Sequence, residues 1–276
     1  MLYIIGLGLA DAKDVSIRGH EIIKNCQKIY LEAYTSILLI PIEELKSFYG
    51  RDDIIEADRT LVEQQAERIL DDAEKGDTAF LVVGDALSAT THTDLIIRAM
   101  DRKIPFKVLH NASIMNAIGC TGLQLYRFGE TVSIVFWEDN WKPVSFFEKI
   151  VKNRVNNFHT LCLLDIKMKE QSVENMMKNN NIFEPPRWMT CQVCCEQFLE
   201  ILEQGNEDFK AAGITPETKI MGVSKVGSDK QKMVYASIAE HAKENLLGEP
   251  LHSLVIPAEE LHELELEFLD HFKLDN

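Results

Sequence analysis

The stretch Leu2-Tyr3-Ile4-Ile5-Gly6-Leu7-Gly8-Leu9-Ala10-Asp11 decides the fold class of this chain. An apolar run leads directly into a glycine-rich turn, a pattern typical of a buried parallel strand that is followed by a helix. Glycines at positions 6 and 8 allow a tight turn and a close approach of the backbone to a neighbour. The sequence therefore predicts an α/β fold in which this turn forms one wall of a small-molecule pocket.

A dinucleotide-binding fingerprint differs from this turn at one position. The fingerprint requires a third glycine where this chain has Asp11. A carboxylate there would repel a pyrophosphate, although Glu32, at the end of the next strand, could imitate the acid that binds a ribose. The turn by itself leaves a plain strand-to-helix connection equally open, but a ligand without phosphates fits it better than NAD does.

The first 110 residues alternate between strand and helix patterns. We expect further strands at 28–31, 54–55, 78–83 and 106–109, and helices at 15–25, 42–49, 61–73 and 95–100. This alternation predicts a parallel sheet with right-handed crossovers. Ligands bind beyond the carboxyl ends of such strands, which directs attention to the loops at 6–14, 32–36, 84–92 and 110–116.

A second α/β unit follows the first. Its expected strands are 132–136, 160–164, 219–223 and 253–256, and its expected helices are 146–154, 191–203, 232–247 and 259–272. A short helix between Asn111 and Thr131 would connect the two halves. We therefore expect an N-terminal domain over residues 1–112 and a C-terminal domain over residues 113–276.

The composition excludes several classes of protein. Apolar residues make up 46% of the 276 residues, and the formal net charge is −15. A chain this acidic is a poor candidate for binding nucleic acid or an anionic membrane, both of which need clustered Lys and Arg. No apolar run approaches the ~18–20 residues of a membrane span, and no basic leader precedes the first strand. We expect a soluble cytoplasmic protein.

The six cysteines fit a reducing compartment. Cys191, Cys194 and Cys195 resemble a metal or redox spacing, but no second Cys or His pair stands nearby. Because a structural zinc site needs four ligands, we expect these residues to begin a helix and to hold no metal.

The loop at 84–92 is the densest polar cluster and follows a fully apolar strand. Asp85 could accept hydrogen bonds from a ligand hydroxyl or ammonium group, and Thr90, Thr91 and His92 could line the pocket. The alternative is a capping loop, with Thr91 or Thr93 as the N-cap of the next helix. We favour the ligand site, because capping does not need so many polar residues.

Three other places carry polar or aromatic residues at strand ends. Ser113 could cap a helix or touch a ligand, whereas His110 and His159, as single histidines, are more typical of structural groups. The segment 137–141, with Trp at both ends, either lines a substrate cleft or packs at its rim.

These segments together resemble the diphthamide-pathway branch of the tetrapyrrole methylase superfamily. The match rests on Leu31-Glu32-Ala33-Tyr34-Thr35-Ser36, on Gly84-Asp85 with Ala89-Thr90-Thr91-His92, and on His110-Asn111-Ala112-Ser113-Ile114. It continues through Gly122 to Tyr126, Leu163 to Lys167 and Gly248 to Ser253, and covers essentially the whole chain. The Glu-Ala-Tyr-Thr-Ser and Ala-Thr-Thr-His blocks are specific to this branch, whereas the Gly-Leu-Gly turn is shared across the superfamily.

The resemblance implies a two-domain α/β methyltransferase with an N-terminal parallel sheet and a C-terminal mixed sheet. Its cofactor would be S-adenosylmethionine, bound in the cleft between the domains and released as S-adenosylhomocysteine. The substrate implied is a histidine of translation elongation factor 2 that already carries a 3-amino-3-carboxypropyl group. The family trimethylates the amino group, and eukaryotic-type members, which this chain resembles at 184–189, also methylate the carboxylate. The family is a homodimer.

Carried onto this chain, the family's cofactor contacts are Leu9, Asp85, Ser88, Ser113, Ile114, Leu164, Val226 and His252. The superfamily usually has Pro where this chain has Ala86, and relatives often have Arg where it has Lys225. Ser88 stands at a variable position, so its contact would come from the backbone. These departures weaken the assignments of Ser88 and Val226 most.

No pair of His and Asp has the spacing of a catalytic dyad, so we name no general base and expect catalysis without an obligatory one. His92 and Glu32 are guesses for that role, and Tyr34 could orient the substrate. Two other classes of function stay open at this point: an NAD-dependent oxidoreductase that uses Gly6-Leu7-Gly8, and a non-enzymatic module that binds a translation factor. The third glycine that is missing at Asp11 argues against the oxidoreductase.

Overall fold

The computed structural model describes residues 1–34, 38, 40–168, 170, 175, 177, 180, 182–205 and 212–274. Thr35 and Ser36, which end one of the predicted loops, lie outside the described residues. The chain divides into two compact units, Met1–Ala117 and Ile118–Asn276. Among the described residues, no helix is both long and apolar enough to cross a membrane.

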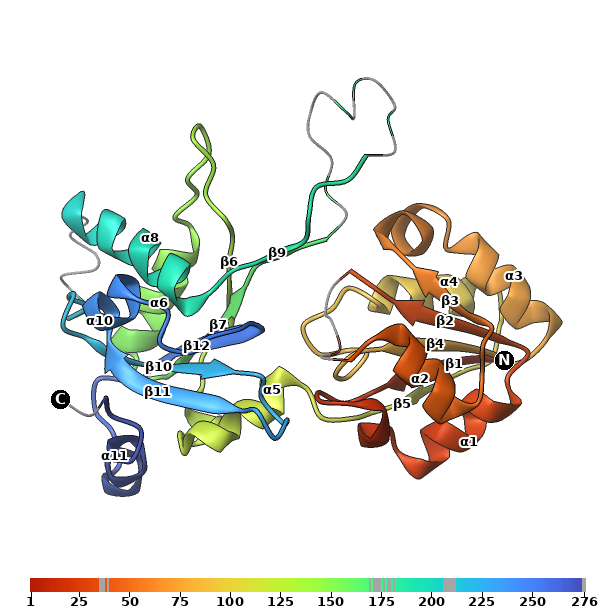
Figure 1. Ribbon diagram of the computed structural model, residues 1–276, viewed down its shortest axis with the longest axis horizontal. Coiled ribbons are helices and arrows are strands. Elements are labelled where there is room, and N and C mark those ends of the chain that lie inside the picture. Colours follow the sequence, from red (N-terminus) through yellow and green to blue (C-terminus); the bar gives the residue numbers. More distant parts are fainter. Residues whose placement is uncertain are drawn as a thin grey trace. The chain divides into compact units, whose positions relative to one another are not determined.

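The first unit is built on a five-stranded parallel sheet, as the strand and helix alternation predicts (Figure 1). Its strands stand in the order β3-β2-β4-β1-β5, and the bounds are β1 Leu2–Gly6, β2 Lys28–Glu32, β3 Ile54–Ala57, β4 Thr78–Val82 and β5 Phe106–Leu109. All neighbouring pairs are parallel. Because β1 lies between β4 and β5, the loops that follow these three strands emerge side by side at the carboxyl edge.

Helices cover both faces of this sheet. Helices α1 (Ile17–Asn25) and α2 (Ile42–Tyr49) bury Ile23, Leu45 and Tyr49 in one hydrophobic cluster. Helices α3 (Glu67–Lys75) and α4 (Thr93–Asp101) contribute to a separate cluster on the other face. Burial on both sides explains why β4 is apolar along its whole length. The short helix α5 (Ile114–Ala117) ends the unit.

The second unit is built on a mixed sheet. Its strand order is β11-β10-β12-β7-β6, in which only β6 and β7 run parallel to each other. The bounds are β6 Val132–Ile134, β7 Thr160–Leu164, β10 Lys219–Ser224, β11 Lys232–Ser237 and β12 His252–Ile256. A short ribbon pairs β8 (Ile166–Lys167) with β9 (Arg187–Trp188). The helices are α6 (Phe146–Val155), α8 (Cys191–Glu203), α10 (Ile238–Lys243) and α11 (Glu263–Asp270).

Two of the predicted helices are wrong in part. The single helix expected at 61–73 is divided into a π-helical turn, Thr60–Gln64, and α3. The amide of Gln65 bonds the carbonyl of Thr60, and the chain leaves the helical conformation at Gln65. The apolar residues of the predicted face are nevertheless buried, so the periodicity was informative about burial and not about continuity.

The helix expected at 232–247 begins with a strand. Residues Lys232–Ser237 form β11, antiparallel to β10, and α10 follows directly. Ser237 and Glu240 form a capping box that marks this boundary in the sequence as Ser-x-x-Glu. The aromatic and β-branched residues before it, Val234 and Tyr235, are the strand signal that the helical prediction overlooked.

Candidate cofactor site

The glycine turn after β1 packs against the loop after β4. The amide of Gly8 donates to the carbonyl of Gly84 at 3.2 Å, and the amide of Gly84 donates back to Gly8 at 2.7 Å. A Cβ atom on Gly6 would lie 2.6 Å from the carbonyl oxygen of Gly84, and Gly8 has a φ of +80°. The close approach that the glycines permit is therefore an approach of the chain to itself.

Asp14 occupies the amides that a phosphate would need. Its Oδ2 atom accepts hydrogen bonds from the backbone amides of Leu9 at 3.1 Å and Ala10 at 2.8 Å. These amides follow the glycine turn, where a dinucleotide-binding protein presents N–H groups to a pyrophosphate. Asp11, which stands at the third glycine position, instead caps the following 3-10 turn by accepting from Lys13. The sequence argument used Asp11 and missed Asp14.

The carboxylate of Asp85 links the loops after β4 and β5. Its Oδ1 atom accepts from the amide of Leu87 at 2.9 Å and from the hydroxyl of Ser88 at 3.4 Å. Its Oδ2 atom accepts from the amide of Asn111 at 3.0 Å and lies 2.9 Å from Nδ1 of His110. A carboxylate has about four lone-pair sites, and all are used here within the chain. Although burial opposes ionisation, these hydrogen bonds and His110 hold the pKa of Asp85 below its ordinary value.

Asn111 fixes the same region from β5, and its role has no signal in the sequence beyond its place in a polar loop. Its Nδ2 atom donates to the carbonyls of Gly6 and Asp14, both at 2.9 Å. Hydrogen bonds of Asp85 and Asn111 thus link the ends of β1, β4 and β5.

All five predicted cofactor residues of the first unit lie at this edge. Leu9 follows β1, Asp85 and Ser88 follow β4, and Ser113 and Ile114 follow β5. The hydroxyl of Ser113 accepts from the amide of Met115 at 3.3 Å, so Ser113 does cap the first turn of α5. The amide of Ser88 bonds the carbonyl of Asp85 at 3.2 Å.

The three predicted residues of the second unit also share one end of their sheet. Leu164 ends β7, His252 begins β12, and Val226 follows β10 within two residues of its end. Since β12 is antiparallel to both β7 and β10, the end of each neighbour meets the start of β12. The sheet therefore brings Leu164, Val226 and His252 together.

The ring of His252 is held within its own unit. Its Nδ1 atom accepts from the amide of Cys191 at 3.2 Å, and Nε2 lies 3.1 Å from the carbonyl of Glu249, to which it donates. Burial lowers the pKa of His252, so the ring is neutral at pH 7. A ligand at this position would meet the backbone of His252 more readily than its ring.

The two segments that are specific to the diphthamide-pathway branch place Tyr34 and His92 next to each other. The two rings meet edge to face, with 6.4 Å between their centroids, and His92 also meets Phe80 at 5.1 Å. The amide of Tyr34 donates to the carboxylate of Glu32 at 3.2 Å. Burial lowers the pKa of His92 to about 4, which makes it a weak base. The alternative of a cap at Thr91 or Thr93 is wrong: α4 begins after His92 without a side-chain cap.

Other residues considered in the sequence have structural roles. His159 is fully buried, accepts from the amide of Ala258 and lies 3.1 Å from Glu265. Trp137 donates to the carbonyl of Pro143, while Trp141 is half exposed. Cys191, Cys194 and Cys195 lie in the hydrophobic core of the second unit, and burial raises the pKa of each thiol.

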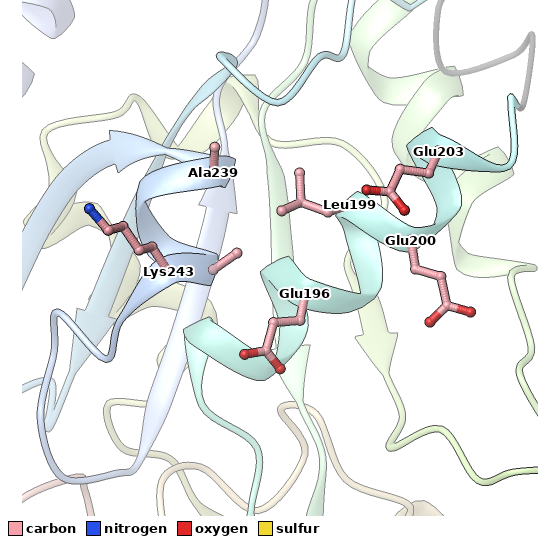
Figure 2. A pocket seen from close by; sticks show the side chains of 7 residues that line it. Glu196, Leu199, Glu200, Glu203, Ala239 and Lys243 are labelled. Carbon is pink, nitrogen blue, oxygen red and sulfur yellow. The ribbon is translucent and has the colours of Figure 1, made fainter.

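A shallow hollow between α8 and α10 does not involve the predicted site. Figure 2 shows glutamates along α8, with Leu199 facing α10. The hollow has a volume of about 750 Å³ and is lined by Glu196, Leu199, Glu200, Glu203, Ala239, Ala242 and Lys243. Glu200 forms an ion pair with Lys142. None of the eight predicted cofactor residues lines this hollow.

Comparisons with known proteins agree with the observed fold and identify one family. Residues 1–242 match the family model of the tetrapyrrole (corrin/porphyrin) methylases. Diphthine methyl ester synthase of Mus musculus is 54% identical over 99% of this chain and 97% of its own length. The Saccharomyces cerevisiae enzyme of the same name is 53% identical over the whole chain and 90% of its own length. A solved structure of a diphthine synthase, 28% identical, has a TM-score of 0.82 and covers 99% of this chain and 95% of its own.

Proposed function

The chain belongs to the tetrapyrrole (corrin/porphyrin) methylase family, and we propose that it methylates translation elongation factor 2 with S-adenosylmethionine as the methyl donor. The chain is a methyltransferase of diphthamide biosynthesis, because relatives more than half identical over nearly its whole length are diphthine methyl ester synthases. The proposed acceptor is a histidine bearing a 3-amino-3-carboxypropyl group. The products are its trimethylated amine and, as in eukaryotic-type members, the methyl ester of its carboxylate.

The glycine turn supports this donor over a dinucleotide. The Asp14 carboxylate on the amides of Leu9 and Ala10 fills the place of a pyrophosphate and would repel one. S-adenosylmethionine carries no phosphate and has a sulfonium and an ammonium group, both of which favour a negative environment. This single observation carries the choice of ligand within the first unit.

We assign the cofactor contacts to residues of both units. They are Leu9, Asp85, Ser88, Ser113 and Ile114 in the first unit, and Leu164, Val226 and His252 in the second. Because the side chains of Asp85 and His252 are saturated by hydrogen bonds within the chain, we infer that these two act by positioning the backbone around the ligand.

The chemistry requires alignment more than proton transfer. S-adenosylmethionine supplies a methyl group on a positively charged sulfur. The amine lone pair forms the new N–C bond as the S–C bond breaks, and the bonding electrons stay on sulfur. Correct alignment can supply about 7–11 kcal/mol. Each amine proton leaves to water, because His92, with a pKa of about 4, is a poor base at neutral pH.

Calorimetry with S-adenosylmethionine and with NAD tests the choice of cofactor. We expect saturable binding of S-adenosylmethionine and none of NAD; binding of NAD alone would favour the oxidoreductase instead.

Transfer of labelled methyl groups to elongation factor 2 then distinguishes an enzyme from a binding module. A His92 or Glu32 variant that binds both substrates normally but loses most of the chemical step would overturn catalysis without a side-chain base.

We also propose a homodimer in the cytoplasm, as the family resemblance implies, with no direct contact to nucleic acid or membrane. Sedimentation of the purified chain tests the oligomeric state, and a monomer at all concentrations would contradict it.

A further inference from the structure

A small cavity in the first unit is lined by residues that follow three of its strands. Its volume is about 260 Å³, and its lining residues are Tyr34, Val62, Glu63, Thr91, His92, Asp94 and Leu95. They follow β2, β3 and β4, which are neighbours in the sheet, so the cavity opens at the carboxyl edge. Sites for whole small molecules span roughly 300–1,000 Å³. This cavity therefore suits a side chain or a head group.

His92 lines this cavity, and its ring carries polar atoms without a partner. Its side chain is 1% exposed, and neither ring nitrogen has a hydrogen-bond partner among the residues that the structure describes. A buried polar group without a partner is costly and is rare in folded proteins. The neutral ring can donate a hydrogen bond from one nitrogen and accept one at the other.

The remaining polar lining favours a cation. The guanidinium of Arg59 lies over the ring of Tyr34, 5.5 Å from its centroid, and pairs with Glu63 at 3.6 Å. The ring face of Tyr34 thus already attracts a positive charge. Asp94, which also forms an ion pair with Arg98 at 2.8 Å, adds a second carboxylate at the cavity. Glu32 and Glu63 help to raise the pKa of Tyr34. The side chain of Arg59 is 69% exposed, so a ligand can reach it from solvent.

We propose that this cavity binds the methylated ammonium group of the substrate, which displaces Arg59 from the face of Tyr34. Glu63 and Asp94 balance its charge. A ring N–H of His92 donates to the carboxylate attached to the same carbon as the ammonium nitrogen. The identity of this ligand rests on the function proposed above. Retention of partly methylated amines would allow successive transfers on one substrate.

Choline and its uncharged isostere 3,3-dimethylbutan-1-ol test the site directly, with binding to the full chain followed by NMR. We expect choline to bind at least about 10-fold more tightly than the isostere, because only choline gains the cation–π and carboxylate interactions. Glu63→Gln and Tyr34→Leu should weaken choline about 3- to 10-fold. Arg59→Ala should tighten it by removing the internal competitor. Glu21→Gln, an exposed change on α1, is the matched control and should have no effect.

Equal affinities for choline and the isostere, or weaker choline binding by Arg59→Ala, would overturn the proposal. If Tyr34→Leu fails to fold, Glu63→Gln and Arg59→Ala still test the proposal, because the side chain of Arg59 is 69% exposed and that of Glu63 is 49% exposed. A chain that methylates elongation factor 2 without preferring choline keeps the proposed function and loses this site. A chain that prefers choline but transfers no methyl group loses the proposed function and keeps an ammonium site.

Product distribution gives an independent readout. Glu63→Gln should enrich mono- and dimethylated products while its affinity for S-adenosylmethionine stays unchanged. A merely structural role would lower turnover without altering the ratio of products, and that result would count against the proposal.

Discussion

At the scale of single residues, the candidate site is organised by side chains that bond the backbone. Asp85 saturates its carboxylate on two loops, and Asn111 bridges the carbonyls of Gly6 and Asp14. Polar composition at strand ends located Asp85 in advance. The partners of Asp14 and Asn111 could not be read from the sequence, because they depend on which loops meet in space.

Asp85→Asn should weaken S-adenosylmethionine binding by about 10-fold or more. The amide nitrogen cannot accept the hydrogen bonds that one carboxylate oxygen accepts now, and bonds to a charged group are worth about 1.5–3 kcal/mol each. Isothermal calorimetry measures the change. Asp101→Asn is the control, since Asp101 is exposed on α4. Equal affinities in the two variants would show that the site is misplaced.

His92 should make the first unit sensitive to acid. Its pKa is about 4 in the folded chain and 6.5 in the unfolded chain, so the unfolded chain binds the proton first as the pH falls. The free energy of unfolding should therefore decrease between pH 6.5 and pH 4, by about 3 kcal/mol for this residue. Denaturant titrations at pH 6.5 and at pH 4 measure this decrease, and in His92→Gln it should be smaller by the part that His92 contributes. The exposed control His271→Gln should leave it intact; identical pH profiles for wild type and His92→Gln would contradict the assignment.

At the scale of elements, strand patterns were the most reliable part of the sequence. The strands at 106–109 and 160–164 and the helix at 191–203 have the bounds expected from apolar runs and periodicity. The error at 232–247 has a local cause, since an amphipathic stretch can pair as an edge strand when a neighbour such as β10 is available. The division of 61–73 at Gln65 depends on a backbone hydrogen bond that periodicity does not report.

Gly6→Ala tests the packing of the glycine turn against the loop after β4. The added Cβ would stand 2.6 Å from the carbonyl oxygen of Gly84, and backbone cannot yield as a flexible side chain can. We expect a loss of about 2–3 kcal/mol in the free energy of unfolding and weaker cofactor binding. Gly119→Ala is the comparison, because the atom nearest to its added Cβ belongs to the side chain of Leu125, at 3.3 Å, and not to backbone. A fully stable Gly6→Ala variant would contradict the close approach.

At the scale of the whole molecule, two sheets of different kinds each gather their predicted cofactor residues at one edge. Alternation of strands and helices was sufficient to predict the parallel sheet, and the family resemblance supplied the mixed one. The composition does not identify the substrate, because a net charge of −15 is compatible with many partners. The relatives, and not the periodicity, identify the pathway.

The most direct test is mass spectrometry of elongation factor 2 after incubation with the purified chain and S-adenosylmethionine. The factor must carry the unmethylated 3-amino-3-carboxypropyl histidine. We predict mass increments of whole methyl groups on that one residue, including a trimethylated amine and its methyl ester. The increments should be about 10-fold less abundant when Asp85→Asn replaces the wild type at limiting cofactor. An unmodified histidine after prolonged incubation, with S-adenosylmethionine bound to the chain, would contradict the account.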